Sequence, residues 1–432
     1  MTMPVLITVS AGDFEVRSFD RRLAMNSKPK VLMIVTLDTK AVEAQFVRQI
    51  LEAEAVDVVH LDASIRDSTD PNVEIGPEAV AAAAGKTIQE VRDLRHEGKC
   101  QAVMIEGAVK CALEAHAKHG FAGIIGVGGS MGTTLGSVVM KAFPYGLPKV
   151  MVSTMASGFT RPFVGAKDII MVNPVCDIAG LNSITRDAFR NAAIATAAMA
   201  KNYSPVRTEP KPLIAMTTLG TTDRCTVRVR KSLERNGYEV MVFHTLGTGG
   251  MAMDQIVRER DVAAVVDLSL VEINDYLNNG MFSAGPDRAK AALEKGVPVI
   301  FAPGNADFML SGPIDMAKTQ FPGKRYHIHN QAITAVRTEA GELQQLAKHM
   351  GSLIASAKGP VSFFVPLKGF SHHDSPEGHL HDPSLCPVFS AALKKALPAS
   401  VPVTEFDCHI NDPQFAEAIV EQVLASVRYT AN

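Results

Sequence analysis

Short apolar runs alternate with amphipathic segments along most of the chain, which is the pattern of an α/β protein. In the first half, buried strands are predicted at Val31–Thr36, Val56–Leu61, Gly123–Val127, Lys149–Ser153 and Ile169–Val172. Helices are predicted at Lys40–Ala53, Pro77–Ala84, Ile88–His96 and Ser183–Lys201. Because the strand segments are continuously apolar, they predict a parallel sheet that helices cover on both faces.

A proline-rich stretch interrupts this alternation. Asn202–Pro212 reads NYSPVRTEPKP and holds three prolines, which is typical of a linker. The pattern then restarts, with strands predicted at Leu213–Thr218, Glu239–His244, Val262–Leu268, Val297–Ala302, Val361–Val365 and Val403–Phe406. Helices are predicted at Thr226–Asn236, Met251–Arg258, Glu339–Ala357, Leu385–Leu397 and Pro413–Arg428.

The predicted fold class is therefore α/β, with two doubly wound, mainly parallel-sheet (Rossmann-like) domains joined by a Pro-rich linker. The expected boundaries are an N-terminal extension over 1–30, a first domain over 31–202, a linker over 203–212 and a second domain over 213–432. Ligands of such sheets bind outside the carboxyl ends of the strands, so candidate chemistry is sought there.

Composition narrows the class of protein. The 432 residues are 47% hydrophobic, and 43 basic residues nearly balance 45 acidic ones, which argues against nucleic-acid or membrane-surface binding. Trp is absent and only six Tyr occur, so stacking platforms for single strands are few. The six cysteines are scattered without a C-x-x-C, as expected of reduced thiols in the cytoplasm. No apolar run suits a membrane span, the charged first 28 residues do not resemble a secretory signal, and Met25 is an alternative start.

The clearest candidate chemistry follows the strand at Gly123–Val127. There Gly128-Gly129-Ser130-Met131-Gly132-Thr133-Thr134 leads directly into a helical pattern. Backbone N–H groups at a helix N-terminus lack partners and lie at the positive end of the helix dipole, and glycines let a ligand approach them. This arrangement is how α/β proteins hold phosphate, although no Gly-Lys-Ser/Thr follows, so the turn is not a Walker A motif.

Two further strand ends in the first half carry polar residues. One is Thr36-Leu37-Asp38-Thr39-Lys40, and the other runs from Ser153 to Gly158. Lys40 can offset phosphate charge and Asp38 can hold Mg²⁺, so the set suits a nucleoside triphosphate with magnesium. The alternatives stay open: Asp38 or Thr39 can cap the next helix, and Ser153 can bind local backbone.

The second half contains another strand, glycine turn and helix, with the turn at His244-Thr245-Leu246-Gly247-Thr248-Gly249-Gly250. Thr217, Thr218, Thr221 and Thr222 follow the neighbouring strand. A second anion site is predicted, for a substrate carboxylate or phosphate, and a glycine-rich connection without a ligand is the alternative. The residues proposed for it are Thr218, Gly247, Thr248, Gly249 and Gly250.

Carboxylates and histidines also follow strands of the second half. Asp307, His329 and His409 are candidate catalytic acid–base groups, because histidine titrates near neutrality. For His329, a hydrogen-bonded structural role is the alternative, and the neighbours of His409 can cap the helix that begins at Pro413. A loop resembles a metal cluster by composition, but a plain surface loop is the favoured interpretation. Its residues are His372, His373, Asp374, His379, His381 and Asp382.

Longer motifs carry a family resemblance over about Val31 to Val427. VTLDTK, GVGGSMGT, STMASGFTRPFVGAKD, DIAGLN, FHTLGTGGMAMD, SAGPDR, HIHNQAITAVRT and FDCHINDPQFA resemble the ATP-binding domain family typified by the N-terminal part of the tomato mosaic virus resistance protein. The resemblance implies two α/β subdomains, ATP with Mg²⁺ in the first, and a homodimer. The matching nucleotide contacts are Asp38, Thr39, Lys40, Gly128, Gly129, Ser130, Gly132, Thr133, Ser157 and Gly158. Met131 replaces a glycine that is usual in the family, so a negative φ is required there.

These observations favour a cytoplasmic ATP-binding protein that carries out phosphoryl or adenylyl transfer to a small molecule, with the acceptor in the second domain or the interdomain cleft. A non-catalytic, ATP-dependent module that binds a protein partner is the first alternative. An ATP-independent hydrolase or lyase that uses Asp307, His329 and His409 is the second.

Overall fold

The structure is a computed structural model that describes residues 28–66, 73–158, 160–204 and 211–430. Met25, nearly all of the predicted N-terminal extension and residues 205–210 of the predicted linker lie outside the described residues. The chain divides into two compact units: Met1–Val164 with Asp168–Pro205, and Gly165–Lys167 with Val206–Asn432.

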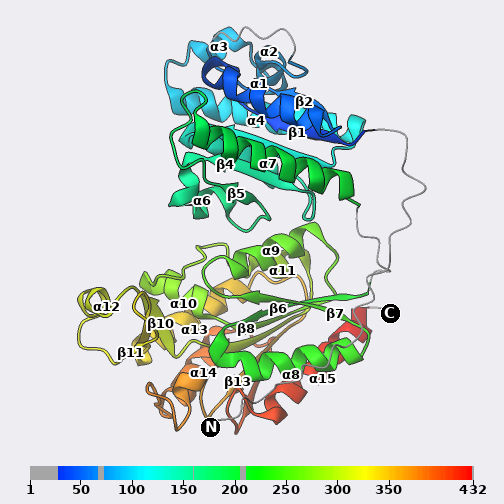
Figure 1. The fold of residues 1–432 in the computed structure, drawn as a ribbon. Coiled ribbons are helices and arrows are strands. Elements are labelled where there is room, and N and C mark those ends of the chain that lie inside the picture. Colours follow the sequence, from blue (N-terminus) through cyan, green and yellow to red (C-terminus); the bar gives the residue numbers. More distant parts are fainter. Residues whose placement is uncertain (1–27, 67–72, 159, 205–210, 431–432) are drawn as a thin grey trace, which may run out of the picture. The chain divides into compact units, whose positions relative to one another are not determined.

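The first unit contains one parallel sheet (Figure 1). Its strands are β1 (Lys30–Ile34), β2 (Asp57–Leu61), β3 (Gly123–Gly128), β4 (Lys149–Ser153) and β5 (Ile170–Val172). Their order is β2-β1-β3-β4-β5, and Val31 pairs with both Val58 and Gly123. In this order the chain turns back between β1 and β3, and such a switch point leaves a crevice at the carboxyl ends of the two strands.

Helices cover both faces of this sheet. One face packs on α1 (Leu37–Ala53) and α7 (Ser183–Asn202). The other packs on α2 (Pro77–Ala83), α3 (Ile88–Arg92), α4 (Glu97–His119) and α5 (Ser130–Lys141). The short helices η1 (Thr154–Ser157) and α6 (Arg161–Val164) follow β4.

Helix α4 was not predicted. Its two internal glycines weaken the helical signal, yet Gly107 is required, because a Cβ there would lie 1.8 Å from the Val80 carbonyl oxygen. The helix is ended by Gly120 in a left-handed conformation, with φ of 68°. Close packing of α2 on α4 therefore explains glycines that the sequence pattern counts against a helix.

The second unit contains a six-stranded parallel sheet. Its strands are β6 (Leu213–Thr218), β7 (Glu239–His244), β8 (Ala264–Ser269), β9 (Val299–Gly304), β13 (Val361–Pro366) and β14 (Val403–Phe406). Read from β7, the order is β7-β6-β8-β9-β13-β14, so the strand order of the first sheet recurs with one strand added. The equivalent switch point lies between β6 and β8.

The helices of the second unit again lie on both faces of its sheet. Helices α8 (Asp223–Arg235) and α15 (Pro413–Thr430) lie side by side against one face (Figure 1). The remaining helices are η2 (Gly220–Thr222), α9 (Gly249–Glu259), α10 (Val271–Asn278), α11 (Lys290–Lys295), α12 (Ile314–Gln320), α13 (Ala340–Ile354), η3 (His372–Asp374) and α14 (Leu385–Ala396).

A small antiparallel sheet in the second unit was also missed. It consists of β10 (Phe308–Ser311), β12 (Thr334–Arg337) and β11 (Tyr326–Ile328), in that order. Strands of three or four residues give too short a run for a period-2 pattern to be recognised. The turn after β11 carries His329, so this sheet places one of the candidate histidines.

The predicted fold class is confirmed, since each unit is a parallel sheet flanked by helices. All six cysteines are free thiols. Among the described residues, no helix has both the length and the apolar character needed to cross a membrane.

Candidate functional site

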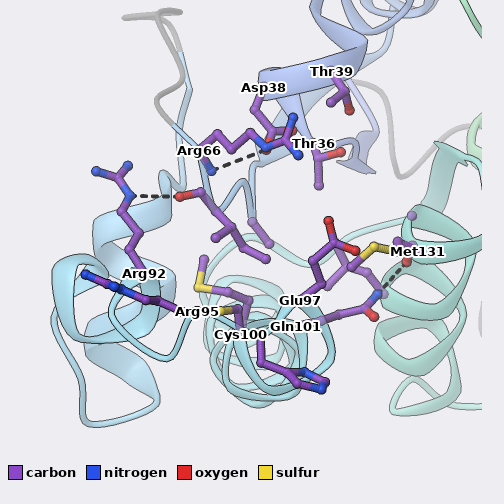
Figure 2. Close-up of a pocket in the computed structure, with 16 residues that line it drawn as sticks. Thr36, Asp38, Thr39, Arg66, Arg92, Arg95, Glu97, Cys100, Gln101 and Met131 are labelled. Atoms are coloured by element: carbon purple, nitrogen blue, oxygen red, sulfur yellow. Dashed lines mark hydrogen bonds between the residues drawn. The ribbon is translucent and has the colours of Figure 1, made fainter.

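A cavity of about 340 Å³ lies at the carboxyl edge of the first sheet (Figure 2). It takes residues from three strand ends and from the start of α4 and α5. The lining residues are Thr36, Asp38, Thr39, Ala63, Ile65, Arg66, Arg92, Arg95, His96, Glu97, Cys100, Gln101, Met104, Met131, Gly132 and Leu135. Thr36 follows β1 and Gly132 follows β3, so the cavity lies at the switch point of the sheet.

The N-terminus of α5 contributes backbone donors to this cavity. Gly129 is the N-cap residue and supplies no side-chain cap. The first ladder bond of the helix runs from Thr133 N–H to the Gly129 carbonyl oxygen, at 2.8 Å. Within the described part of the chain, the N–H groups of Ser130, Met131 and Gly132 have no acceptor. They are therefore available to an anion, at the positive end of the helix dipole.

Glycine is required at the turn itself. A Cβ on Gly128 would lie 2.7 Å from the Gly132 Cα, so a side chain there would displace the first turn of α5. Gly129 has no such neighbour, since its nearest contact would be Thr154 Oγ1 at 3.9 Å. The two glycines thus have different roles: Gly128 lets the helix start close to β3, and Gly129 leaves the helix end uncapped.

Three arginines give the cavity an excess of positive charge. Arg66, Arg92 and Arg95 line it together with the carboxylates of Asp38 and Glu97. The Arg66 N–H donates to Asp38 Oδ2 at 3.3 Å, and Arg92 Nε donates to the Ile65 carbonyl oxygen at 2.8 Å (Figure 2). Arg95 has a φ of 48°, which is uncommon for a residue with a side chain. An anionic ligand is favoured by this balance.

The N-terminus of α1 differs from that of α5, because the protein supplies its acceptors. Asp62 Oδ1 accepts from the Leu37 N–H at 3.1 Å, and Ser64 Oγ accepts from the Asp38 N–H at 3.1 Å. Asp62 and Ser64 are buried after β2. Asp38 is therefore not needed as the cap of α1, and its carboxylate stays at the cavity.

The predicted nucleotide residues separate into two groups. Asp38, Thr39 and Gly132 line the cavity, and Gly128, Gly129 and Ser130 build the turn that supports it. Four other predicted contacts do not line it: Lys40, Thr133, Ser157 and Gly158.

One of the residues that do not line the cavity, Thr133, is held by contacts within the protein. The hydroxyl of Thr133 is buried and lies 2.7 Å from the Gly129 carbonyl oxygen and 2.6 Å from Ser153 Oγ. Ser153 Oγ also accepts from the Met155 N–H, so Ser153 binds local backbone. Lys40 interrupts α1 with a φ of −133°. Ser157 and Gly158 are exposed at the end of η1.

Met131 raises no backbone difficulty, because it lies inside α5 and has a negative φ. Its side chain is 39% exposed and lines the cavity.

The three arginines of the cavity were not predicted from the sequence. Arg66 follows a predicted strand, which was an available signal, whereas Arg92 ends α3 and Arg95 lies between α3 and α4, so their positions depend on how these helices pack.

The second glycine turn holds a carboxylate of the protein itself. The N–H groups of Gly247 and Gly250 donate to Glu272, at 2.8 Å to Oε1 and 3.1 Å to Oε2. Glu272 is fully buried, and Arg288 Nε donates to its Oε2 at 2.8 Å. In the first unit the N–H groups after the glycine turn have no acceptor among the described residues, whereas in the second unit the Glu272 carboxylate accepts from the N–H groups of the turn.

Arg288 joins this turn to a second buried carboxylate. Its Nη1 and Nη2 each donate to Asp267, both at 2.8 Å, and Thr217 Oγ1 donates to Asp267 Oδ1 at 2.7 Å. Asp254 accepts from the Ala289 N–H at 2.8 Å. Burial raises the pKa of Asp254 to about 6, although Arg288 opposes the shift.

The other residues proposed for the second anion site have internal contacts or border the turn. Thr218 Oγ1 lies 2.7 Å from Thr226 Oγ1. Gly249 packs so closely that a Cβ would lie 1.9 Å from the His244 carbonyl oxygen. Thr248 is the N-cap residue of α9 without a side-chain cap.

Of the three candidate catalytic residues, Asp307 and His409 meet at Ser371. Ser371 Oγ donates to Asp307 Oδ2 at 2.7 Å, and His409 Nε2 lies 2.9 Å from the Ser371 carbonyl oxygen. Burial and then the Asp374 charge raise the pKa of Asp307 to about 7. Arg337 Nη1 lies 3.2 Å from Asp374 Oδ1. His329 does not join this cluster in any hydrogen bond and lines a separate pocket.

The histidine-rich loop forms a ring cluster. The His327 ring centroid lies 4.3 Å from that of His373 and 5.1 Å from that of His379. His381 Nδ1 instead lies 3.0 Å from the Asp374 carbonyl oxygen. Among the described residues, no three His, Cys, Asp or Glu side chains are placed to hold a metal ion.

Fold and site define a protein of two doubly wound α/β units, each with a glycine turn at the carboxyl edge of its sheet. Sequence profiles extend this result to a family. The chain matches the N-terminal domain of the uncharacterised protein family UPF0261 over residues 29–205 and the C-terminal domain of that family over residues 211–427. It belongs to this family.

Relatives agree with this assignment. A UPF0261 protein of Clostridium tetani is 35% identical, over 91% of this chain and 98% of the relative. The ToMV susceptible protein tm-1(GCR26) of Solanum lycopersicum is 30% identical over 93% of this chain but only 56% of the relative, so this chain spans about half of the tomato protein. The resemblance noted from the motifs is confirmed in part: the relatives include tomato tm-1 proteins, but the matching family is UPF0261, and no ATP-binding domain family is shown.

Solved structures add nothing to the functional argument. A UDP-GlcNAc 2-epimerase of Methanocaldococcus jannaschii aligns over 92% of each chain with 10% identity and a TM-score of 0.21. So low a score carries no inference about ligand or reaction.

Proposed function

We propose that this chain is a cytosolic protein that binds ATP with Mg²⁺ in the cavity of the first unit and uses the nucleotide in phosphoryl or adenylyl transfer to a small molecule. The observation that carries the proposal is the uncapped N-terminus of α5 beside three arginines, at the switch point of a parallel sheet. The cavity of about 340 Å³ falls within the usual range for small-ligand sites.

The residues present fit a nucleotide with a divalent cation. Backbone N–H groups of Ser130, Met131 and Gly132, with Arg66 and Arg92, would neutralise phosphate oxygens. Asp38 is the half-buried carboxylate that would hold Mg²⁺, because Mg²⁺ is usually bound by one or two carboxylates with water and phosphate. The bound Mg²⁺ would stabilise negative charge that develops on the transferred group.

Transfer chemistry of this kind depends on positioning and charge neutralisation more than on a protein nucleophile. The chain's own contribution would be to orient the phosphates along α5 and to keep the acceptor close. We place the acceptor in the second unit, where a further pocket lies. A homodimer, which the family resemblance implies, belongs to this proposal and is tested by light scattering.

The decisive variant is Gly129→Asp. Aspartate is a favourable N-cap residue, so the change should keep or raise stability while its carboxylate occupies the N–H groups of α5. Calorimetric titration with ATP, with and without Mg²⁺, should show binding to the wild type and at least an approximately tenfold weaker affinity for Gly129→Asp.

The matched control is Gly76→Asp, the same change at the N-cap of α2, where a Cβ meets only Glu78 Oε2 at 3.6 Å. This variant should bind ATP like the wild type. Absence of ATP binding by the folded wild type, or equal affinity in Gly129→Asp, would overturn the proposal. A metabolite screen for ATP consumption then tests the transfer step.

The competing function is a non-catalytic module that binds ATP and a protein partner. The name of the tomato relative refers to ToMV susceptibility, and partner binding by the present chain is the corresponding proposal. Tight ATP binding without turnover under any acceptor, together with ATP-dependent partner affinity, would support the module over the enzyme.

A further inference from the structure

A second pocket, of about 480 Å³, lies in the second unit. Leu219, Gly220 and Thr221 reach it from the end of β6, and His244 and Leu246 reach it from the end of β7. The carboxyl ends of β6 and β7 are the counterparts of those of β1 and β2 in the first sheet. The pocket therefore lies at the carboxyl edge of the second sheet, the edge at which doubly wound sheets bind ligands, next to the switch point between β6 and β8.

Most of the side chains that line this pocket are apolar: Leu219, Leu246, Phe282, Phe308, Leu310, Ile333 and Ala335. None of the described residues that line it is Lys, Arg, Asp or Glu. Moving a charged group from water into such surroundings is costly without a partner, so the lining disfavours an ionic ligand.

The nearby glycine turn offers no substitute for a charged partner. The N–H groups of Gly247 and Gly250 already donate to Glu272, and Arg288 is held by Glu272 and Asp267. The anion-binding groups beside the pocket are thus satisfied within the protein.

A few polar groups are nevertheless fixed at the pocket. Asn305 Nδ2 donates to Thr221 Oγ1 at 2.5 Å, and Asn411 Nδ2 donates to the Thr221 carbonyl oxygen at 2.9 Å. Asn305 is fully buried with a φ of 61°, an unfavourable conformation that the surrounding contacts must maintain. Thr221 Oγ1 accepts from Asn305, and no described residue accepts from its hydroxyl, so this hydrogen is available to a ligand.

His373 supplies an acceptor. Its ring packs edge-on against Phe308, with centroids 5.5 Å apart, and neither ring nitrogen has a hydrogen-bond partner in the described part of the chain. Burial, followed by the neighbouring His327 and His372, lowers the pKa of His373 to about 4. The imidazole is therefore neutral at pH 7 and can accept a hydrogen bond.

We propose that this pocket binds a small, uncharged, ring-containing molecule that bears a hydroxyl group, with the ring among the apolar side chains and the hydroxyl at His373 and Thr221. The inference rests on the proposed function only in calling this molecule the acceptor. Binding itself needs no nucleotide, so the two proposals can fail separately.

The test uses 2-naphthol and its anionic counterpart 2-naphthoate as probes, at pH 7.5. Because the protein contains no Trp, naphthalene fluorescence can be measured without indole background. We expect saturable binding of 2-naphthol at one site and an affinity for 2-naphthoate weaker by about tenfold or more. Equal affinities, or no binding of 2-naphthol, would overturn the proposal.

Gly220→Phe locates the site. A Cβ on Gly220 meets nothing within 4 Å, so a side chain can begin there without a clash, and we expect its ring to occupy the pocket that Gly220 lines. The matched control is Gly341→Phe, in the first turn of α13, where a Cβ also meets nothing within 4 Å. Loss of 2-naphthol binding in Gly220→Phe alone supports the assignment, and unchanged binding in Gly220→Phe overturns it.

His373→Phe tests the polar contact, because it keeps a ring beside Phe308 and removes the acceptor. Its 2-naphthol affinity should fall by about fivefold or more, whereas naphthalene, which lacks the hydroxyl, should bind wild type and variant alike. An unchanged 2-naphthol affinity contradicts the hydroxyl contact. Gly129→Asp should bind 2-naphthol normally, which separates this outcome from a failure of the nucleotide proposal.

Discussion

At the scale of single residues, the stability of the protein depends on how its buried charged side chains are paired. Asp267, Glu272 and Arg288 are almost fully buried, and each of them is bonded to at least one of the others. Burying such charges costs desolvation free energy. Removing one partner destabilises the protein further, because it leaves an unpaired buried charge. Gly250 is part of this arrangement although it carries no charge.

Gly250→Ala should be severely destabilising. The added methyl carbon would lie 1.9 Å from Arg288 Nε and 2.0 Å from Glu272 Oε2, so the ion pair must separate. We expect a loss of about 3 kcal/mol or more in the free energy of unfolding, measured by urea denaturation. Gly220→Ala is the control and should change it by less than about 1 kcal/mol, since its Cβ meets nothing. A small loss in Gly250→Ala would contradict the described contact.

Asp307→Asn should flatten the pH dependence of stability. Burial and Asp374 raise the pKa of Asp307 to about 7, so the folded protein keeps this proton where the unfolded chain has released it. Stability is then fully present below the unfolded pKa, near 4, and falls as pH rises toward 7, by up to about 1.4 kcal/mol per pH unit. Asn at this position does not titrate, so the decline should become shallower in urea denaturation series between pH 4 and 7.

The control for this series is Asp261→Asn, at an exposed carboxylate after α9. Its pH dependence should match that of the wild type. A wild-type decline that persists in Asp307→Asn would show that another group causes it.

At the scale of elements, the strands of the main sheets follow from sequence more reliably than the connections do. β4, β6, β7 and β14 have the predicted bounds, because each consists mainly of apolar or β-branched residues. The three-stranded antiparallel sheet and α10, α11 and α12 were not predicted, because these elements are short and their hydrophobic pattern is weak. The candidate site shows the same limit: Asp38 and Gly132 follow strands and were found, whereas Arg92 and Arg95 depend on how α3 and α4 pack.

Gly128→Ala tests how α5 begins. A Cβ there would lie 2.7 Å from the Gly132 Cα and 2.9 Å from its carbonyl carbon, so the first turn must shift. We expect a loss of about 2 kcal/mol or more in the stability of the first unit and loss of ATP binding. Gly132→Ala, whose nearest contact would be 3.5 Å away, should fold normally. Equal stability of the two variants would show that the turn tolerates a side chain.

At the scale of the whole molecule, two units share one strand order but differ in their use of it. The carboxyl edge of the first sheet presents arginines and free N–H groups, and that of the second presents an apolar pocket beside a filled turn. Each unit has its own hydrophobic core. A ligand bound to one unit should therefore stabilise that unit first.

Calorimetric heating should reveal this selectivity. ATP with Mg²⁺ at about 100 times its dissociation constant stabilises the state that binds it by about 2.7 kcal/mol. We expect the unfolding transition of the first unit to move to higher temperature, and 2-naphthol to move that of the second. Gly129→Asp should abolish only the first shift, and Gly220→Phe only the second. A single transition that both ligands shift equally would show that the units unfold together.

The carboxylate in the second turn has a consequence for engineering. The substitution Glu272→Gly would leave a cavity lined by Arg288 and by the N–H groups of Gly247 and Gly250. Acetate or formate in the buffer should then restore the lost stability in a dose-dependent manner, as chemical rescue. The thermal unfolding of this variant would therefore measure the affinity of these N–H groups for a free anion.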